Sequence, residues 1–409
     1  MPGLKRFFLS LLVALLLSCS MSHAQTTQPT PIRVSLLVYG AGADVYERFG
    51  HCGLRLRQEG RFDLICDWGV FDFTPDFLFK FARKDLRYWM EIYDHGDRVI
   101  HSYAKIDRTI TEYDLDLTPE QARNLARDVQ SMYESDRKFY DYDYFANNCS
   151  TILRDTLDRA LDGQIRKATE GRMTPYSYRW HMRRLLPVGL ANKIALMGAD
   201  VSLGSPTDRP LNEWQTMFLP AEMGRSLESV QVMGSDGTLK PLVTGRRVLN
   251  VTRTPDHVEP VAPATAWPWW LAFGLAGAGA IVGLGRLKLR WPAGLMIVGW
   301  SLVATLWGLF MLYVMTLTKH DFARWNQNFL LFNPVSFGVI VGLLIRRWRP
   351  VAKWSAVIVL GLALVAVVLH VVPGIARQAN LPELLAIVPI HAAVACRVWK
   401  RRSRSSRSV

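Results

Sequence analysis

Cysteine is scarce in this sequence: five cysteines in 409 residues are too few for a scaffold built on disulfides. A composition typical of disorder is also absent, because half of the residues are hydrophobic. Positive charge is abundant, with 49 Lys and Arg against 35 Asp and Glu, for a formal net charge of +14. Such an excess is typical of nucleic-acid-binding proteins. The position of the charge along the chain tests that interpretation.

Acidic residues are missing from three basic clusters in the C-terminal part. The clusters lie at 286–290, 346–353 and 397–407, and they hold thirteen Lys and Arg. They alternate with five apolar segments, each near membrane-spanning length, at about 267–285, 291–315, 329–345, 354–373 and 383–399. Cytoplasmic loops of membrane proteins are enriched in Lys and Arg. The pattern predicts a five-helix transmembrane domain at 267–399, a basic cytoplasmic tail at 400–409 and an N-terminal part on the outside.

The soluble part has no excess of positive charge. Residues 25–266 contain 31 Lys and Arg against 33 Asp and Glu, for a net charge of −2. Binding to a phosphate backbone requires cations clustered on one folded face. The basic excess therefore belongs to the membrane topology, and we expect no nucleic-acid partner.

The N-terminus has an apolar run too short to span a bilayer. Lys5 and Arg6 precede roughly eleven apolar residues, whereas a spanning helix needs about 20. Together with Ser22-His23-Ala24 before Gln25, this run indicates a secretory signal peptide at 1–24. Alternatively, Leu16-Leu17-Ser18-Cys19 resembles a lipobox that would leave Cys19 lipidated. In both cases we expect a flexible leader at 25–32 outside the cytoplasm.

An α+β domain with one antiparallel sheet is predicted at 33–255, followed by a linker at 256–266. Strands are expected at 33–39, 51–57, 62–68, 86–93, 97–103 and 109–116, and helices at about 75–84, 118–134, 149–161, 175–186 and 208–218. If Glu59-Gly60 is a two-residue turn, Cys52 and Cys66 point to opposite faces of the hairpin, which disfavours a disulfide. A register slip of one residue would reverse that conclusion.

Cys149 is the candidate nucleophile. It follows Asn147-Asn148, either of which can cap the helix that begins there. A thiol in the first helical turn lies near unpaired backbone N–H groups and the positive end of the helix dipole, which favour the thiolate. The same N–H groups can stabilise an oxyanion. A buried, inert cysteine is the alternative interpretation.

His51 is the candidate general base. It begins a strand directly after Gly50, and a histidine on a strand facing a cysteine at a helix start can form a thiolate–imidazolium pair. His95 and His101 are alternative bases, and a structural role for His51 is equally compatible with the sequence. A zinc site from His51, Cys52, Cys66 and Cys149 matches no recognised ligand spacing. We expect no metal and no cofactor.

Four stretches carry a resemblance to a known family: Glu47-Arg48-Phe49-Gly50-His51, Trp68-Gly69-Val70-Phe71-Asp72-Phe73, Tyr142-Asp143-Tyr144-Phe145-Ala146-Asn147-Asn148-Cys149 and Trp325-Asn326-Gln327-Asn328-Phe329-Leu330-Leu331-Phe332-Asn333-Pro334. Together they resemble the bacterial family named for the N-terminal periplasmic domain of the lipoprotein intramolecular transacylase Lnb. The order of a histidine strand before a cysteine helix is also similar to the permuted papain-like fold of NlpC-type peptidases and lecithin-retinol acyltransferase.

This resemblance implies a thiol active site that transfers an acyl group from a lipid-linked substrate. By position, Cys149 is the nucleophile and His51 the base. The resemblance does not assign the third, orienting residue; Asn148, or a polar residue on a strand adjacent to His51 such as Asp67, is the candidate. Cys52 departs from the family pattern, in which we expect Thr or another small residue after the histidine.

The main hypothesis is therefore a membrane-anchored acyltransferase in the bacterial cytoplasmic membrane, with a membrane lipid or lipoprotein as its substrate. An amidase or peptidase acting on cell-wall peptides is the second hypothesis, and a non-catalytic envelope sensor or assembly module is the third. The loop at 316–328, with His320 and Trp325, is expected on the same side of the membrane as Cys149. Asn326, Asn328 and Asn333 are expected to form hydrogen bonds between helices or to the domain above.

Overall fold

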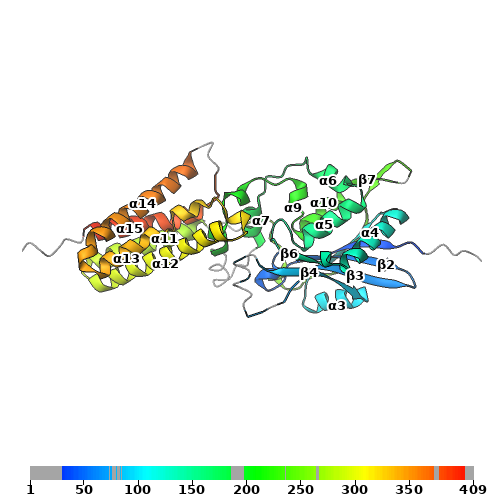
Figure 1. Ribbon diagram of the computed structural model, residues 1–409, viewed down its shortest axis with the longest axis horizontal. Helices are drawn as coiled ribbons and strands as arrows, with labels where there is room; N and C mark the ends of the chain where they lie inside the picture. Colours follow the sequence, from blue (N-terminus) through cyan, green and yellow to red (C-terminus); the bar gives the residue numbers. More distant parts are fainter. Residues whose placement is uncertain are drawn as a thin grey trace, which may run out of the picture.

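The computed structural model describes residues 30–400 except for 73, 76–79, 81–82, 84, 186–197, 235, 264–266 and 373–376. The signal peptide at 1–24, Cys19, residues 25–29 of the leader and residues 401–409 of the tail lie outside the described residues. So does most of the helix expected at 75–84. The described chain has two parts, a mixed α+β part and a bundle of helices, arranged end to end (Figure 1).

One antiparallel sheet of seven strands organises the α+β part. Its spatial order is β6-β4-β3-β2-β1-β5-β9. The strands are β1 (Arg33–Tyr39), β2 (His51–Gln58), β3 (Phe62–Val70), β4 (Arg87–Asp94), β5 (Ile110–Leu115), β6 (Phe139–Asp141) and β9 (Val243–Asn250), while β7 (Gln231–Met233) and β8 (Leu239–Pro241) form a separate pair. The predicted α+β class is confirmed. The sheet continues to β9, a strand that the sequence pattern did not indicate.

Helices pack on both faces of this sheet (Figure 1). One face carries α4 (Pro119–Tyr133), α5 (Cys149–Ala160) and α10 (Pro220–Glu228), and the other carries α3 (Gly96–Lys105). The remaining helices of this part are α6 (Gln164–Thr169), α7 (Tyr178–Leu185) and α9 (Glu213–Thr216). Short 3-10 turns lie at η1 (Val45–Glu47), η2 (Asp136–Lys138), η3 (Ser205–Asp208) and η4 (Pro255–His257).

The expected strand at 97–103 is wrong, because this segment is the helix α3. Its apolar residues Val99, Ile100, Tyr103 and Ala104 follow helical spacing and pack on one face of the sheet. The capping box at Thr118 is confirmed: its hydroxyl accepts from the Gln121 N–H at 3.2 Å, and the Gln121 side chain accepts from the Thr118 N–H at 2.9 Å.

The predicted register of the hairpin β2–β3 is also wrong, by one residue. Gly53 lies opposite Asp67, and Leu54 lies opposite Cys66. The turn therefore has three residues, 59–61, rather than two. Because side chains alternate along a strand, the slip places Cys52 and Cys66 on the same face. Both are buried as free thiols in the core between the sheet and α5.

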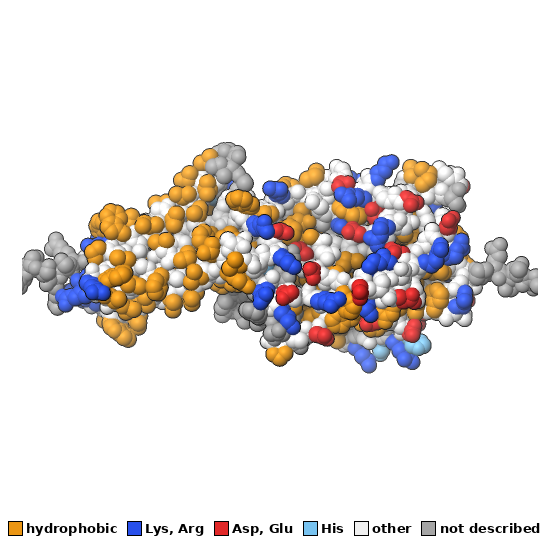
Figure 2. Space-filling view, in the orientation of Figure 1, with side chains coloured by type: hydrophobic (Ala, Val, Ile, Leu, Met, Phe, Trp, Pro, Cys, Tyr) orange, Lys and Arg blue, Asp and Glu red, His pale blue; other side chains and the backbone are white. Residues whose placement is uncertain are grey.

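The second part contains five helical segments that are long and apolar enough to cross a membrane. They are Trp267–Arg286 (α11), Arg290–Leu317 (α12), Gln327–Leu344, Arg346–Val371 and Leu381–Trp399 (α15). The third segment comprises the turns η6 (Gln327–Leu330) and η7 (Pro334–Ser336) and the helix α13 (Phe337–Leu344), while the fourth comprises η8 (Arg346–Trp348) and α14 (Arg349–Val371). Hydrophobic side chains cover this bundle, with Lys and Arg at the end away from the soluble part (Figure 2). These features support an integral membrane protein.

Hydrogen bonds join the soluble part to the near end of the bundle. The side-chain amides of Asn326 and Asn328 both donate to the carbonyl oxygen of Val201, at 2.7 and 3.1 Å. The backbone N–H of Gly204 donates to the carbonyl of Phe322 at 2.8 Å, within the turn η5 (Asp321–Ala323). The expected contacts of Asn326 and Asn328 to the domain above are confirmed, and they hold the loop after α12 against the soluble part.

Candidate active site

Cys149 is the first residue of α5, and the turn before it fixes its position. Asn148 caps the helix, with its side-chain oxygen accepting from the Thr151 N–H at 2.9 Å while the Thr151 hydroxyl accepts from the Asn148 N–H at 2.8 Å. Upstream, the carboxylate of Asp143 accepts from the N–H groups of Phe145 and Ala146, both at 2.9 Å. This local network places the Cys149 thiol at the positive end of a 12-residue helix.

His51 begins β2, and a carboxylate on the neighbouring strand holds its ring. Nε2 of His51 hydrogen-bonds with Oδ1 of Asp67 on β3. The Asp67 side chain is 7% exposed and that of His51 is 18% exposed. The ring of His51 also stacks on Tyr39 at 5.9 Å between centroids. The imidazole is thus held in one orientation while one edge stays accessible.

Gly69 lies where His51 and Cys149 meet. It is the extra residue of a β-bulge in β3, between Trp68 and Val70, with φ of +102°. A Cβ on Gly69 would lie 3.4 Å from Cβ of Cys149, 3.7 Å from Cε1 of His51 and 3.9 Å from Oη of Tyr140. Three reactive side chains therefore surround one point at which glycine leaves room. Bulges of this kind occur beside active sites, where they redirect side chains.

The charges around Cys149 favour a thiolate–imidazolium pair. A hydrogen bond from the Cys52 thiol and the positive charge of His51 hold the pKa of Cys149 well below its ordinary value, although burial acts in the opposite direction. Burial alone would lower the pKa of His51, but the carboxylate of Asp67 and the Cys149 thiolate raise it well above its ordinary value. A thiolate is the nucleophilic form of cysteine.

Cys52 contributes a second thiol to the site. It is fully buried, and burial together with the Cys149 thiolate raises its pKa well above the ordinary value of a cysteine. Cys52 therefore stays protonated and donates its S–H to Cys149. This contact depends on the observed register, which turns Cys52 toward α5.

Tyr140 on β6 was not singled out by sequence reasoning. Its hydroxyl is buried and has no hydrogen-bond partner among the described residues. Burial, followed by the nearby Cys149 thiolate, raises the pKa of Tyr140 well above its ordinary value, so the phenol remains a donor. A buried hydroxyl without a hydrogen-bond partner lowers the stability of the fold unless a ligand accepts its hydrogen bond. The dense aromatic run at 139–145 was the signal in the sequence, but it does not identify which ring faces the cysteine.

The other sequence candidates lie elsewhere. The side-chain amide of Asn148 donates to the carbonyl oxygens of Tyr144 and Phe218, both at 3.0 Å, so its contacts are those of a helix cap. Asp67, the alternative third residue, is the one bonded to His51. His95 precedes α3 and His101 lies on it, and both are exposed. Within the described part of the chain, no group of three or more His, Cys, Asp or Glu side chains is arranged to hold a metal ion.

Comparison with known proteins gives one family match. A family model described as the Lnb N-terminal periplasmic domain matches residues 20–184. No curated protein and no solved structure matches the chain. The matched range contains Cys149, His51 and Tyr140 but ends before β9. Residues 20–184 therefore match the Lnb N-terminal periplasmic domain family, and this match together with the five apolar helical segments supports a multi-pass protein of the inner membrane with a periplasmic N-terminal domain.

Proposed function

We propose that the protein is a membrane-anchored Cys/His thiol acyltransferase that acts on acyl esters of lipoproteins or phospholipids. The observation that carries this proposal is the convergence of Cys149, His51 and Tyr140 around Gly69. A nucleophile, an acid–base group and a donor for the oxyanion are the parts that acyl transfer requires.

The reaction begins with attack of the Cys149 thiolate on the ester carbonyl carbon. The carbonyl oxygen becomes an oxyanion, which accepts hydrogen bonds from Tyr140 Oη–H and from the first N–H groups of α5. As the intermediate collapses, the bond to the alcohol oxygen breaks and His51 donates its proton to that oxygen. An acyl thioester remains on Cys149.

In the second half, an amine or a water attacks the thioester carbonyl. His51 takes the proton from this nucleophile, and the Cys149 thiolate leaves. Asp67 keeps the imidazole oriented throughout, and it stabilises the charged form that exists before the alcohol leaves and after the second nucleophile has given up its proton.

The layout also supports a permuted papain-like domain at 33–255, because the histidine strand precedes the cysteine helix and β9 still belongs to the sheet. The loop after α12 contacts this periplasmic domain, so it lies on the periplasmic side. With five crossings the chain would end in the cytoplasm, in agreement with the basic residues at the far end of the bundle (Figure 2).

The test is to isolate the protein from membranes, digest it without reducing agent, and search the Cys149 peptide for a fatty acyl thioester by mass spectrometry. We expect the adduct in the unaltered protein, its loss in Cys149→Ala, and its loss in His51→Ala. Cys66→Ala is the matched control, because it removes another buried thiol from the same core without touching the site.

Full acyl-transfer activity of Cys149→Ala would rule out the mechanism. Turnover of cell-wall peptides without any acyl adduct would favour an amidase instead. A Cys149 that does not react with a haloacetamide in the native protein would indicate a structural cysteine in a sensor or assembly module.

A further inference from the structure

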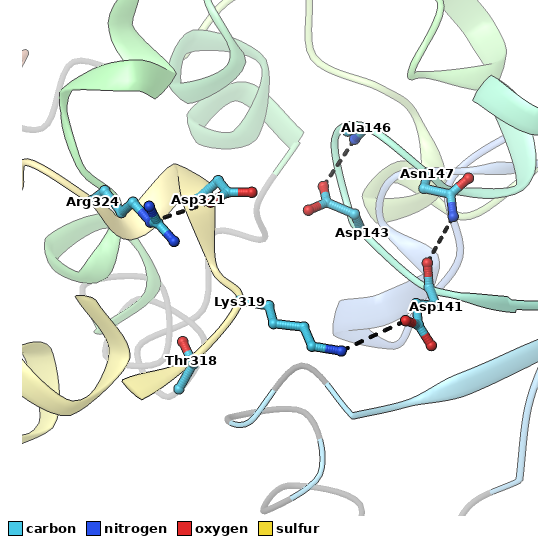
Figure 3. A pocket seen from close by; sticks show the side chains of 8 residues that line it. All are labelled: Asp141, Asp143, Ala146, Asn147, Thr318, Lys319, Asp321 and Arg324. Carbon is cyan, nitrogen blue, oxygen red and sulfur yellow. Dashed lines mark hydrogen bonds and ion pairs between the residues drawn. The ribbon is translucent and has the colours of Figure 1, made fainter. Parts of the chain in front are cut away.

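The soluble part and the membrane bundle enclose a polar hollow beside the turn that leads to Cys149. Its accessible volume is about 510 Å³. One wall is formed by residues 141–147 and the other by residues 318–324 (Figure 3). This volume lies in the range of small-molecule binding sites.

The lining carries charges of both signs. Asp141 and Asp143 lie on the wall of the soluble part, while Lys319, Asp321 and Arg324 lie on the wall of the bundle (Figure 3). Together these five charges sum to −1. A ligand that combines one phosphate with one ammonium group matches such a lining better than a purely anionic ligand does.

The ion pairs across and within the hollow are weak enough to open for a ligand. Nζ of Lys319 lies 3.9 Å from the Asp141 carboxylate, with side chains 75% and 76% exposed. Nε of Arg324 lies 3.2 Å from the Asp321 carboxylate, with side chains 55% and 70% exposed. Exposed ion pairs of this kind contribute little to stability. A phosphate can therefore replace the carboxylates as the partner of these cations with little loss of free energy.

The hollow adjoins the end of a helix that is long and apolar enough to cross a membrane. Helix α12 ends at Leu317, and the wall residues Thr318 and Lys319 follow directly. The side chains of Leu317 and Trp325 flank this loop and are 76% and 81% exposed. Exposed apolar and aromatic residues at the end of a span are typical of the membrane interface.

The two walls are fixed relative to each other. The ring of Phe322 packs edge-on against Phe145 at 4.9 Å between centroids, and its carbonyl accepts from the Gly204 N–H. Phe145 belongs to the turn that ends in Asn147, two residues before Cys149. A preformed hollow binds its ligand without the cost of ordering loops.

We propose that this hollow binds the headgroup of a phosphoethanolamine-type membrane lipid. Lys319 and Arg324 contact the phosphate, while Asp141 and Asp321 contact the ammonium group. The inference deepens the proposed function, because the acyl esters of such a lipid lie a few bonds from its phosphate and would be presented toward Cys149. Binding itself requires no chemistry at Cys149.

The experiment measures lipid binding in the full chain carrying Cys149→Ala, so that turnover does not change the lipid. The protein is placed in nanodiscs of phosphatidylglycerol with increasing phosphatidylethanolamine, and lipids retained after detergent extraction are counted by native mass spectrometry. We expect preferential retention of phosphatidylethanolamine. The double variant Lys319→Gln/Arg324→Gln should weaken the retention of phosphatidylethanolamine by about tenfold, since two charge-assisted contacts to its phosphate are lost.

Arg377→Gln is the matched control, because Arg377 is exposed in the other periplasmic-side loop and does not line the hollow. Equal retention of the two lipids, or equal behaviour of the double variant and the control, would overturn the inference. Soluble glycerophosphoethanolamine that competes as well as the lipid would also overturn it, in favour of a free metabolite. Selective binding without any acyl adduct on Cys149 in the active protein would instead contradict the proposed function alone.

Discussion

Replacing Cys52 with alanine should raise the pKa of Cys149 and leave the fold intact. Hydrogen bonding from the buried Cys52 thiol is the first cause that lowers the pKa of Cys149. The alanine removes the donor and keeps the apolar packing of a residue that is fully buried against α5. His51 and Asp67 remain in place, so the change isolates one contact.

The size of the effect follows from the chemistry of the contact. A hydrogen bond to a charged group is worth about 1.5–3 kcal/mol, and a thiol is a weak donor, so the low end applies. Because about 1.4 kcal/mol corresponds to a pKa difference of one, the pKa of Cys149 should rise by about one. Below the pKa, the thiolate fraction, and with it the rate of alkylation, should fall by about tenfold.

The assay is the rate of iodoacetamide labelling of Cys149 as a function of pH, followed on the Cys149 peptide by mass spectrometry in the full-length protein. Cys52→Ser should restore the low pKa, since a hydroxyl donates at least as well as a thiol. Cys66→Ala is the control and should leave the profile unchanged. A Cys52→Ala profile that coincides with that of the unaltered protein would show that Cys52 does not stabilise the thiolate.

Substitutions at three further residues test the site. Asp67→Asn should lower the pKa of His51, because the carboxylate that raises it is gone. The alkaline limb of the pH profile of kcat/KM, where the imidazolium loses its proton, should then move to lower pH, and kcat should fall by about 100-fold. An unchanged limb would contradict this role. Tyr140→Phe should reduce kcat by about 100-fold with little change in KM or in Cys149 labelling, as expected for a donor that acts on the oxyanion, whereas full activity would remove Tyr140 from the mechanism. Asn148→Ala should lower the free energy of unfolding by about 1 kcal/mol, and Asn148→Ser should recover part of both stability and activity; a complete loss of activity in the Ser variant at normal stability would instead indicate a direct role in catalysis.

Local patterns in the sequence were sufficient for the elements that carry Cys149 and His51. The strand β1 coincides with its prediction, and Cys149 begins α5 as the capping residues indicated. Helix α3 was mistaken for a strand because Val99, Ile100 and Tyr103 are β-branched or aromatic residues typical of strands, although their spacing is helical. Only the contact with the sheet decides between the two.

The partners of Cys149 depend on contacts that short patterns do not contain. Tyr140 reaches the site because β6 pairs with β4, and the paired residues of the two strands are at least fifty positions apart in the sequence. Cys52 faces Cys149 because the hairpin turn has three residues rather than two, and this single residue exchanges the two faces of the strand. The strand β9 joins the sheet more than 120 residues after β5, so no local alternation could place it.

The hydrogen bonds from Asn326 and Asn328 to Val201 have a consequence for how a substrate would arrive. They tie the soluble part to the bundle, so the Cys149 thiol stays at a constant height above the bilayer and does not sample the periplasm on a tether. An acyl ester that remains embedded by its chains would then find the thiol by lateral diffusion in two dimensions. The length of the linkage between the ester and the headgroup would limit how far the ester carbonyl rises from the membrane surface. Substrates would be sorted by how far their ester rises from the membrane surface, before any side chain recognises their chemistry.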